Sequence, residues 1–209
     1  MIEKRDFDHV ASSWDDEPRR VKLAGNVATT IIDTLLPDQT MDVLDFGCGT
    51  GLVTLRLRPW VRSVVGVDSS PGMLSVLERK IRDRKITGVE MISCDIENGE
   101  LPSGRFHMIV SSMTLHHVSE PARLFATFFE LLLPGGVIGI ADLDAEDGSF
   151  HEDPTGVHHH GFDRKMIMDL LIEAGFSDCA AKTADTIIKG AHPVVREYSV
   201  FLITARKPA

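Results

Sequence analysis

Short runs of β-branched and other apolar residues alternate with longer segments of helical period along most of this 209-residue chain. Five of these runs have the length and composition of buried strands, and they span residues 41–46, 63–67, 89–92, 106–111 and 137–143. Segments with apolar residues at helical spacing lie around them, at 18–36, 51–57, 71–85, 121–133 and 163–174. Because parallel strands need such crossovers, the alternation predicts an α/β fold in which helices cover a parallel sheet.

Several boundaries of the predicted helices carry residues that start or stop helices. Pro18 suits a first helical turn, and Pro37 ends the same helix. The segment Pro134-Gly135-Gly136 is expected to terminate the helix at 121–133. Asp163 can cap the last helix, which Gly175 would end.

The carboxyl-terminal part of the chain departs from this alternation. Residues 183–188 and 198–205 have strand composition, and no helical segment separates them. They predict an antiparallel hairpin that closes one edge of the sheet, with a connection that is long for a tight turn.

Length and charge limit the domain organisation and the partners. We expect a single domain over residues 1–209, with residues 1–36 as a helical cap segment within it. The formal net charge of −9 makes nucleic acid a poor partner. A modest basic patch, residues 79–85, lies on a predicted helix.

Membrane and export signals are not recognisable in the sequence. No run of about 18 apolar residues is present, and the amino terminus is charged rather than apolar. The three cysteines are widely spaced and odd in number, which disfavours a disulfide framework. We therefore expect no membrane association and a reducing, cytoplasmic location.

A glycine-rich turn, residues 45–51 with the sequence D-F-G-C-G-T-G, joins the first predicted strand to the next helix. Such a turn lets a ligand lie against the backbone, because glycines lack Cβ atoms. The glycines are spaced G-x-G-x-G, whereas the dinucleotide fingerprint is G-x-G-x-x-G. Asp45 places a carboxylate before them, which would repel a pyrophosphate and attract a cation. The turn therefore predicts a nucleotide-like ligand other than a dinucleotide.

Two further acidic positions follow the second and third predicted strands. Asp68 is placed to accept hydrogen bonds from ribose hydroxyls, although capping of the following helix is an alternative role. Asp95 and Ile96 suit an adenine, with the carboxylate on the exocyclic amine and the isoleucine against the ring. All of these residues lie at the carboxyl ends of strands, where ligands bind in open α/β sheets.

The joint pattern of residues 43–51, Val67-Asp68 and Cys94-Asp95 resembles the class I S-adenosylmethionine-dependent methyltransferases. Residues 115–118 (L-H-H-V) and 132–136 (L-L-P-G-G) add two family motifs in the expected order. The resemblance covers roughly residues 7–206. It implies a Rossmann-like seven-stranded sheet, mostly parallel with an antiparallel carboxyl-terminal strand, and helices on both faces.

The resemblance also implies a set of residues that contact S-adenosyl-L-methionine. The methionine moiety would lie against Asp45, Gly47, Cys48 and Gly49, and the ribose against Asp68, Ser69 and Met73. The adenine would contact Asp95 and Ile96, and the sulfonium would face Ser111 and Met113. Trp14 would close the site from the amino-terminal segment. The opening F-D…W-D of residues 7–15 resembles a small-molecule branch, the type 11/12-like methyltransferases that include menaquinone- and ubiquinone-type C-methyltransferases. Considered alone, Cys48 and Met73 are also typical packing residues.

The histidines supply the candidates for proton transfer. His116 and His117 follow the fourth strand, where the family places groups that face the substrate, and a packing role is the alternative. The segment 142–160 is acidic, has no Lys or Arg and ends in three histidines, which include His159. It is either a solvated loop or the wall of an acceptor pocket. We take His116 and His159 as catalytic candidates and expect no metal site.

The sequence therefore predicts an enzyme that transfers the methyl group of S-adenosyl-L-methionine to a small-molecule acceptor and releases S-adenosyl-L-homocysteine. We expect it to work as a monomer or a homodimer. Two alternatives stay open at this point. One is a nicotinamide-dependent Rossmann oxidoreductase, and the other is a protein that binds S-adenosylmethionine without catalysis.

Overall fold

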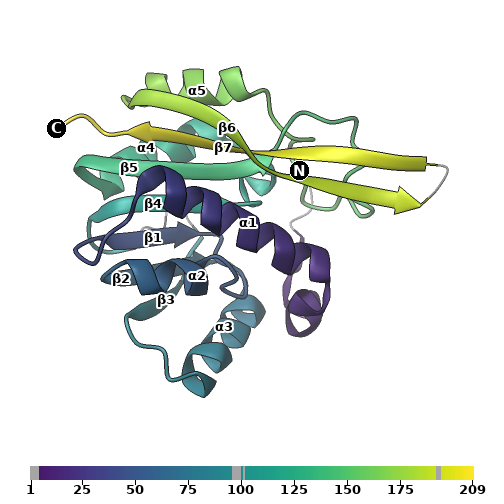
Figure 1. Cartoon of the computed structure of the whole chain (residues 1–209), viewed down its shortest axis with the longest axis horizontal. Helices are drawn as coiled ribbons and strands as arrows, with labels where there is room; N and C mark the ends of the chain where they lie inside the picture. Colours follow the sequence, from purple (N-terminus) through teal and green to yellow (C-terminus); the bar gives the residue numbers. More distant parts are fainter. Residues whose placement is uncertain (1–4, 96–99, 101, 192–193) are drawn as a thin grey trace.

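The computed structural model describes residues 5–95, 100, 102–191 and 194–209. Its centre is a seven-stranded sheet with the strand order β3-β2-β1-β4-β5-β7-β6 (Figure 1). The strands are β1 (Asp42–Phe46), β2 (Ser63–Asp68), β3 (Val89–Ser93), β4 (Phe106–Ser112), β5 (Leu132–Leu143), β6 (Ser177–Ala191) and β7 (Val194–Arg206). Strands β1 to β5 pair in parallel, and β7 is antiparallel to both β5 and β6. The mixed seven-stranded sheet is therefore confirmed.

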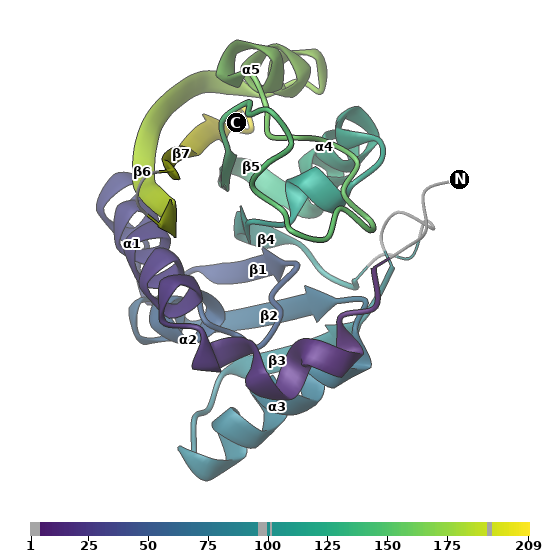
Figure 2. The same ribbon diagram turned by 90° about the vertical axis from the view of Figure 1, so that its right-hand side faces the viewer.

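Helices cover both faces of the sheet, as Figure 2 shows. They are α1 (Pro18–Leu35), α2 (Thr54–Leu57), α3 (Pro71–Asp83), α4 (Pro121–Leu131) and α5 (Arg164–Glu173), with short 3-10 helices η1 (Asp8–Asp16), η2 (Arg58–Trp60) and η4 (Leu115–His117). One buried cluster joins α4 and α5 to the sheet, and a second joins α1 and α2 to its other face. Among the described residues, no helix combines the length and hydropathy needed to cross a membrane.

Two predicted helices have different bounds in the structure. The helix predicted at 51–57 begins only at Thr54, because Gly51 has φ +80° and lies outside helical backbone space. The helix predicted at 121–133 ends at Leu131, and the prediction that Pro134-Gly135-Gly136 terminates it is wrong. Leu132 is already extended and pairs with Phe106, so this segment lies inside β5. Sheet pairing overrides the helical period here.

The carboxyl-terminal hairpin is confirmed, but its strands are much longer than predicted. The pairing of β5 with β7 ends at Leu143 and Val200, whereas β6 and β7 continue pairing to Ala191 and Val194. Residues 186–191 and 194–199 therefore form a two-stranded arm that extends past the carboxyl ends of the parallel strands (Figure 1). The loop 144–162 is fixed to this arm: the Ser149 hydroxyl lies 2.7 Å from that of Tyr198.

Candidate active site

The three glycines of the turn have different structural roles. All three have positive φ, which favours glycine. A Cβ at Gly47 would lie 2.2 Å from Thr114 Oγ1, and one at Gly51 would lie 2.3 Å from Leu77 Cδ1. A Cβ at Gly49 would meet nothing within 4 Å. Packing therefore requires the outer two glycines, and the middle one leaves backbone open toward a ligand.

Asp68 holds the open part of the turn from the end of β2. Its carboxylate accepts hydrogen bonds from Gly49 N at 2.8 Å and from Ser70 N at 2.9 Å. The cap of α3 is Ser70, whose hydroxyl accepts a bond from Met73 N at 3.1 Å. Ser70 therefore fills the role of helix cap that was the alternative for Asp68. The carboxylate of Asp68 is partly exposed and borders the turn.

Asp45 lies beneath the turn and is fully buried. Its carboxylate accepts a hydrogen bond from Thr54 Oγ1 at 2.6 Å. Desolvation raises the pKa of Asp45 to about 7; the charge of Asp68 adds to the rise, while the bond from Thr54 opposes it. Because burial disfavours the ionised form of this carboxylate, a cation bound nearby would stabilise it.

Cys48 turns its side chain away from the open side of the turn. Its thiol packs with Leu74 and Leu77, and its Sγ would lie 3.0 Å from a Cβ at Gly66. Burial raises the pKa of the Cys48 thiol well above its ordinary value. The side chain is a packing group, and only its backbone faces a ligand in the turn.

Other predicted contact residues lie around the same edge of the sheet, in different environments. Met73 is buried against the amino-terminal segment, and Ser69 is exposed. Asp95 follows β3, and its N–H donates to Glu100 Oε2 at 2.7 Å. Ile96 lies outside the described residues.

Two residues after the middle of β4 have features that ordinary packing does not explain. Ser111 is buried, and its hydroxyl is one of the few buried polar atoms of the described residues without a hydrogen-bond partner. Met113 has φ +55°, a strained backbone conformation for a side chain of this size. Both lie where the resemblance places the sulfonium.

The amino-terminal segment is fastened to the glycine turn and to α3. Asp15 accepts a hydrogen bond from Thr50 Oγ1 at 2.6 Å and forms an ion pair with Lys80. Asp8 accepts a bond from Gly72 N at 2.8 Å. Trp14 lies between these anchors, with the Arg20 guanidinium 3.8 Å from its ring centre. The segment that carries Trp14 is therefore held beside the turn.

A buried pair of ionisable residues joins η4 to the end of β5. His116 Nδ1 lies 2.7 Å from Asp142 Oδ1, and both residues are almost inaccessible to solvent. Burial would raise the pKa of Asp142, but the charge and hydrogen bonds of His116 and two backbone N–H groups hold it below its ordinary value. Asp142 is therefore ionised and fixes the orientation of the His116 ring.

Two more histidines complete a cluster that the sequence did not predict as a unit. The His116 ring centre lies 4.2 Å from that of His117 and 4.8 Å from that of His151. His151 Nε2 is buried without a hydrogen-bond partner among the described residues. His151 could not be predicted from the sequence, because nothing local distinguishes it from the other histidines of the 144–162 loop.

His159 lies apart from this cluster. Its Nε2 lies 3.0 Å from the carbonyl of Val118, and its ring packs against Phe162. The backbone N–H groups of His158 and His159 donate to the His116 carbonyl. His159 therefore supports η4 rather than facing the histidine cluster.

The carboxylates of the acidic segment are mostly engaged with other groups. Asp144 pairs with Arg164 at 2.6 Å, and Asp147 pairs with Arg196 on the arm at 2.8 Å. Glu146 accepts a bond from Phe150 N at 3.1 Å. No group of three potential ligands among the described residues is arranged to hold a metal ion.

Acid should destabilise the fold through His117. Burial and the neighbouring His116 lower its pKa to about 4 from an ordinary value of 6.5. Because the pKa of this base is lower in the folded protein than in the unfolded chain, the free energy of unfolding is highest above pH 6.5 and decreases as the pH falls toward 4. We expect His117→Gln, which can keep the bond to the Gly156 carbonyl, to be more stable than wild type by about 2 kcal/mol at pH 5.

Urea unfolding at several pH values measures this effect. The two proteins should have similar stability at pH 8, and His9→Gln, at a side chain that is 85% exposed, is the matched control. A constant difference between His117→Gln and wild type from pH 8 to pH 5 would contradict the assignment.

Comparison with known proteins agrees with the fold and the turn. A family model described as a methyltransferase domain matches residues 43–136. An uncharacterized methyltransferase of Schizosaccharomyces pombe is 30% identical over 81% of this chain and 64% of its own length. Phosphoethanolamine N-methyltransferase 1 of Zea mays is 32% identical over 67% of this chain and 29% of its own length. The chain thus spans less than two thirds of these curated relatives.

Solved structures with the same fold include two N-methyltransferases. Phosphoethanolamine N-methyltransferase 2 of Haemonchus contortus, in complex with phosphomonomethylethanolamine and S-adenosylhomocysteine, aligns with a TM-score of 0.71 at 18% identity. The alignment covers 87% of this chain and 52% of that one. The N-methyltransferase NodS of Bradyrhizobium japonicum aligns with a TM-score of 0.66 at 16% identity, over 93% and 99% of the two chains. With its glycine turn, sheet order and matched family model, the chain carries a methyltransferase domain with the fold of the class I S-adenosylmethionine-dependent methyltransferases.

Proposed function

We propose that this chain binds S-adenosyl-L-methionine at the glycine turn and transfers its methyl group to a small molecule. The observation that carries the proposal is the buried carboxylate of Asp45 beneath an open backbone at Gly49, beside the carboxylate of Asp68. These two acceptors fit the cofactor, which presents a cationic amino group and two ribose hydroxyls as donors. A pyrophosphate would meet two carboxylates instead, which disfavours a nicotinamide dinucleotide.

Each group around the turn would have a distinct task. S-adenosylmethionine supplies the electrophilic methyl group, so the protein mainly aligns the acceptor and excludes water. Asp68 would accept bonds from the ribose, and Asp45 would balance the charge of the amino group. Trp14 would cover the site from the amino-terminal segment.

The acceptor would approach from the side of the histidine cluster. Thr114, just before η4, contacts the turn, since its Oγ1 lies 3.4 Å from the Gly47 carbonyl oxygen. The loop 144–162 meets the amino-terminal segment here, because a Cβ at Gly156 would lie 2.6 Å from Arg5 N. These segments border the acceptor side closely, which supports a small molecule. The relatives named as phosphoethanolamine N-methyltransferases support the same class.

His116 is the residue best placed to take a proton from an acceptor that must lose one. Asp142 orients its ring and would stabilise the imidazolium form, as a buried carboxylate does for a catalytic histidine elsewhere. Asp142 is thus a positioning residue. An acceptor that is already nucleophilic would not need this step.

The proposal makes a pH-dependent prediction for Asp45. A cationic ligand favours the ionised carboxylate, so binding below pH 7 must first displace a proton from a group whose pKa is about 7. We expect the affinity for S-adenosylhomocysteine to rise by about tenfold from pH 6 to pH 8 in wild type. Calorimetry of Asp45→Asn should show weaker binding and little of this rise.

The same substitution should affect stability in the opposite direction. Because the pKa of Asp45 is higher in the folded protein than in the unfolded chain, the protein loses stability as the pH rises from 3.8 to 7. Without ligand, Asp45→Asn should therefore be more stable than wild type at pH 8, on the order of 2–4 kcal/mol. A variant that is less stable at pH 8 and keeps the wild-type pH dependence of binding would refute this role.

The proposed function is tested first by binding and then by turnover. Calorimetry should detect saturable binding of S-adenosylhomocysteine and none of NADH; the reverse would establish the oxidoreductase alternative. A methyl-transfer screen over small amines, thiols, phenols and quinones then tests catalysis. Tight binding of the cofactor with no turnover of any acceptor would favour a non-catalytic protein.

A further inference from the structure

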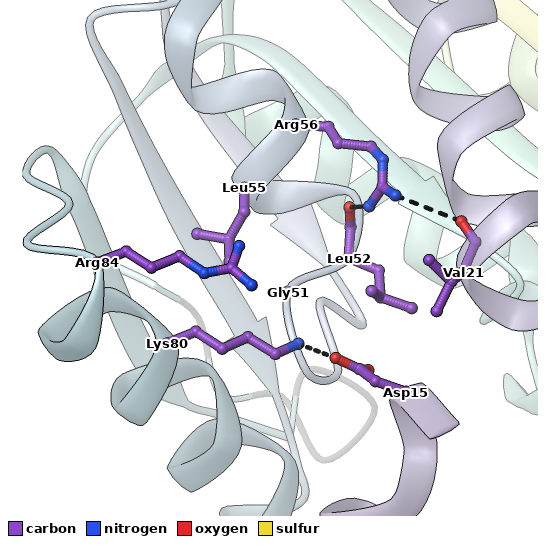
Figure 3. Close-up of a pocket in the computed structure, with 8 residues that line it drawn as sticks. All are labelled: Asp15, Val21, Gly51, Leu52, Leu55, Arg56, Lys80 and Arg84. Atoms are coloured by element: carbon purple, nitrogen blue, oxygen red, sulfur yellow. Dashed lines mark hydrogen bonds and ion pairs between the residues drawn. The ribbon is translucent and has the colours of Figure 1, made fainter. Parts of the chain in front are cut away.

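A cavity of about 380 Å³ lies behind the glycine turn, between α1, α2 and α3 (Figure 3). Its charged lining consists of Asp15, Arg56, Lys80 and Arg84. The cavity meets the turn only at Gly51 and the residue after it, and neither Asp45 nor Asp68 lines it. It is therefore separate from the predicted cofactor cleft.

Positive charge dominates this cavity. The single carboxylate of the lining, Asp15, is already bound to Thr50 Oγ1 and Lys80. Arg56 donates to the carbonyls of Leu52 at 2.6 Å and Val21 at 3.4 Å, and it forms no ion pair within the described part of the chain. Figure 3 shows the guanidinium of Arg84 extending over the cavity toward Leu55. Of the three cations that line the cavity, one is balanced by the carboxylate present, and two charges are left over.

The cations repel one another where they meet. Lys80 is half-buried, and its Nζ also donates to the Thr50 carbonyl at 2.6 Å. Burial lowers the pKa of Lys80, Asp15 opposes this change, and the charges of Arg84 and Arg56 lower it further. An anion between these groups would relieve the repulsion.

We propose that this cavity is a binding site for a small phosphate monoester. Two guanidinium groups and an ammonium group supply the donors that phosphate oxygens accept, with the bidentate geometry that arginine offers. Val21, Leu52 and Leu55 form an apolar wall, against which the organic part of the ligand can pack. The inference does not depend on the proposed methyl transfer.

The site also gives a role to part of the basic patch at residues 79–85. Lys80 lies in the last turns of α3, Arg84 is the residue that caps the end of this helix, and both line the cavity. Arg82 lies on another side of the helix, is 70% exposed and pairs with the neighbouring Asp83. Substitution of Arg82 therefore controls for nonspecific attraction of anions to the basic surface of this helix.

Calorimetric titration with phenyl phosphate and inorganic phosphate tests the proposal. The full chain is used at low ionic strength, with and without saturating S-adenosylhomocysteine to fill the cofactor cleft. We expect saturable binding of phenyl phosphate that S-adenosylhomocysteine does not displace, and weaker binding of inorganic phosphate. Arg84→Gln should weaken binding by about tenfold or more, and Arg82→Gln should leave it unchanged.

Arg84 is exposed, so its substitution should not disturb the fold, and thermal unfolding checks this. Arg56→Gln provides a second variant at the opposite wall of the cavity and should weaken binding similarly. Three results would overturn the proposal: no saturable binding by wild type, equal affinity in wild type and Arg84→Gln, or displacement of phenyl phosphate by S-adenosylhomocysteine. If S-adenosylhomocysteine itself does not bind, the comparison of the arginine variants still decides the question.

Discussion

Replacing Asp68 by alanine is expected to weaken the binding of S-adenosylhomocysteine by about a hundredfold. The carboxylate would accept bonds from both ribose hydroxyls, and each hydrogen bond to a charged group contributes about 1.5–3 kcal/mol. The substitution also frees Gly49 N, which Asp68 binds at 2.8 Å, and so loosens the open part of the turn. Calorimetry with purified wild type and variant measures the loss directly.

A matched carboxylate at the other end of the sheet controls for stability. Asp42 begins β1 and pairs with Arg62, far from the carboxyl ends of the strands. Asp42→Ala should reduce stability and leave the cofactor affinity within about twofold. Equal affinity of wild type and Asp68→Ala for S-adenosylhomocysteine would show that the ligand does not use this carboxylate.

The second large effect is expected at His116. For an acceptor that must lose a proton, His116→Gln should lower kcat by about 10²- to 10³-fold, the range that general-base catalysis supplies. The affinity for S-adenosylhomocysteine should stay near the wild-type value, because the turn and Asp68 are unchanged. Single-turnover assays with an acceptor from the methyl-transfer screen separate this chemical step from product release.

Two further substitutions distinguish a catalytic role from a structural one. Asp142→Asn keeps the size of the buried side chain but removes its charge, so it should lower kcat and change the shape of the pH–rate profile. His159→Gln can keep the bond to the Val118 carbonyl and should change kcat by less than about threefold. If His116→Gln and His159→Gln reduced turnover equally, the histidine cluster would be structural.

Because the His116–Asp142 pair is buried, its disruption also costs stability. Removing one partner of a buried hydrogen-bonded pair leaves the other without its partner, which costs about 1–3 kcal/mol and more for a charged group. Circular dichroism and cofactor binding must therefore confirm that each variant is folded before its kinetics are interpreted. The amide side chains chosen here keep hydrogen-bonding capacity and limit this loss.

The order of the elements and the position of the turn could be predicted from the sequence, because both depend on local patterns. Runs of β-branched and other apolar residues predicted β1 to β5, although β5 begins five residues earlier than expected, and the helical apolar spacing predicted α1, α3, α4 and α5 to within about two residues. Where sheet pairing competes with a local pattern, as at Leu132, the prediction was wrong. The length of β6 and β7 was also underestimated, because both strands continue into the arm beyond the end of their pairing with β5.

The acceptor side could not be assembled from the sequence. His116 and Asp142 are 26 residues apart and carry no spacing signature, and their contact exists because β4 and β5 are neighbours in the sheet. His151 joins them only because the loop 144–162 is fixed to the arm by Tyr198. The same packing places His159 against Val118, away from the cluster.

For this protein, the sequence by itself determined the α/β class, the glycine turn and the positions of the acidic residues beside it, because backbone dihedrals and apolar period are properties of neighbouring residues. The tertiary structure alone decided which histidine Asp142 orients, that Arg164 and Arg196 pair with two carboxylates of the acidic segment, and that Lys80 and Arg84 share a cavity with Arg56. These are contacts between segments far apart in the chain. Their geometry is set by how the elements pack, and no local pattern encodes it.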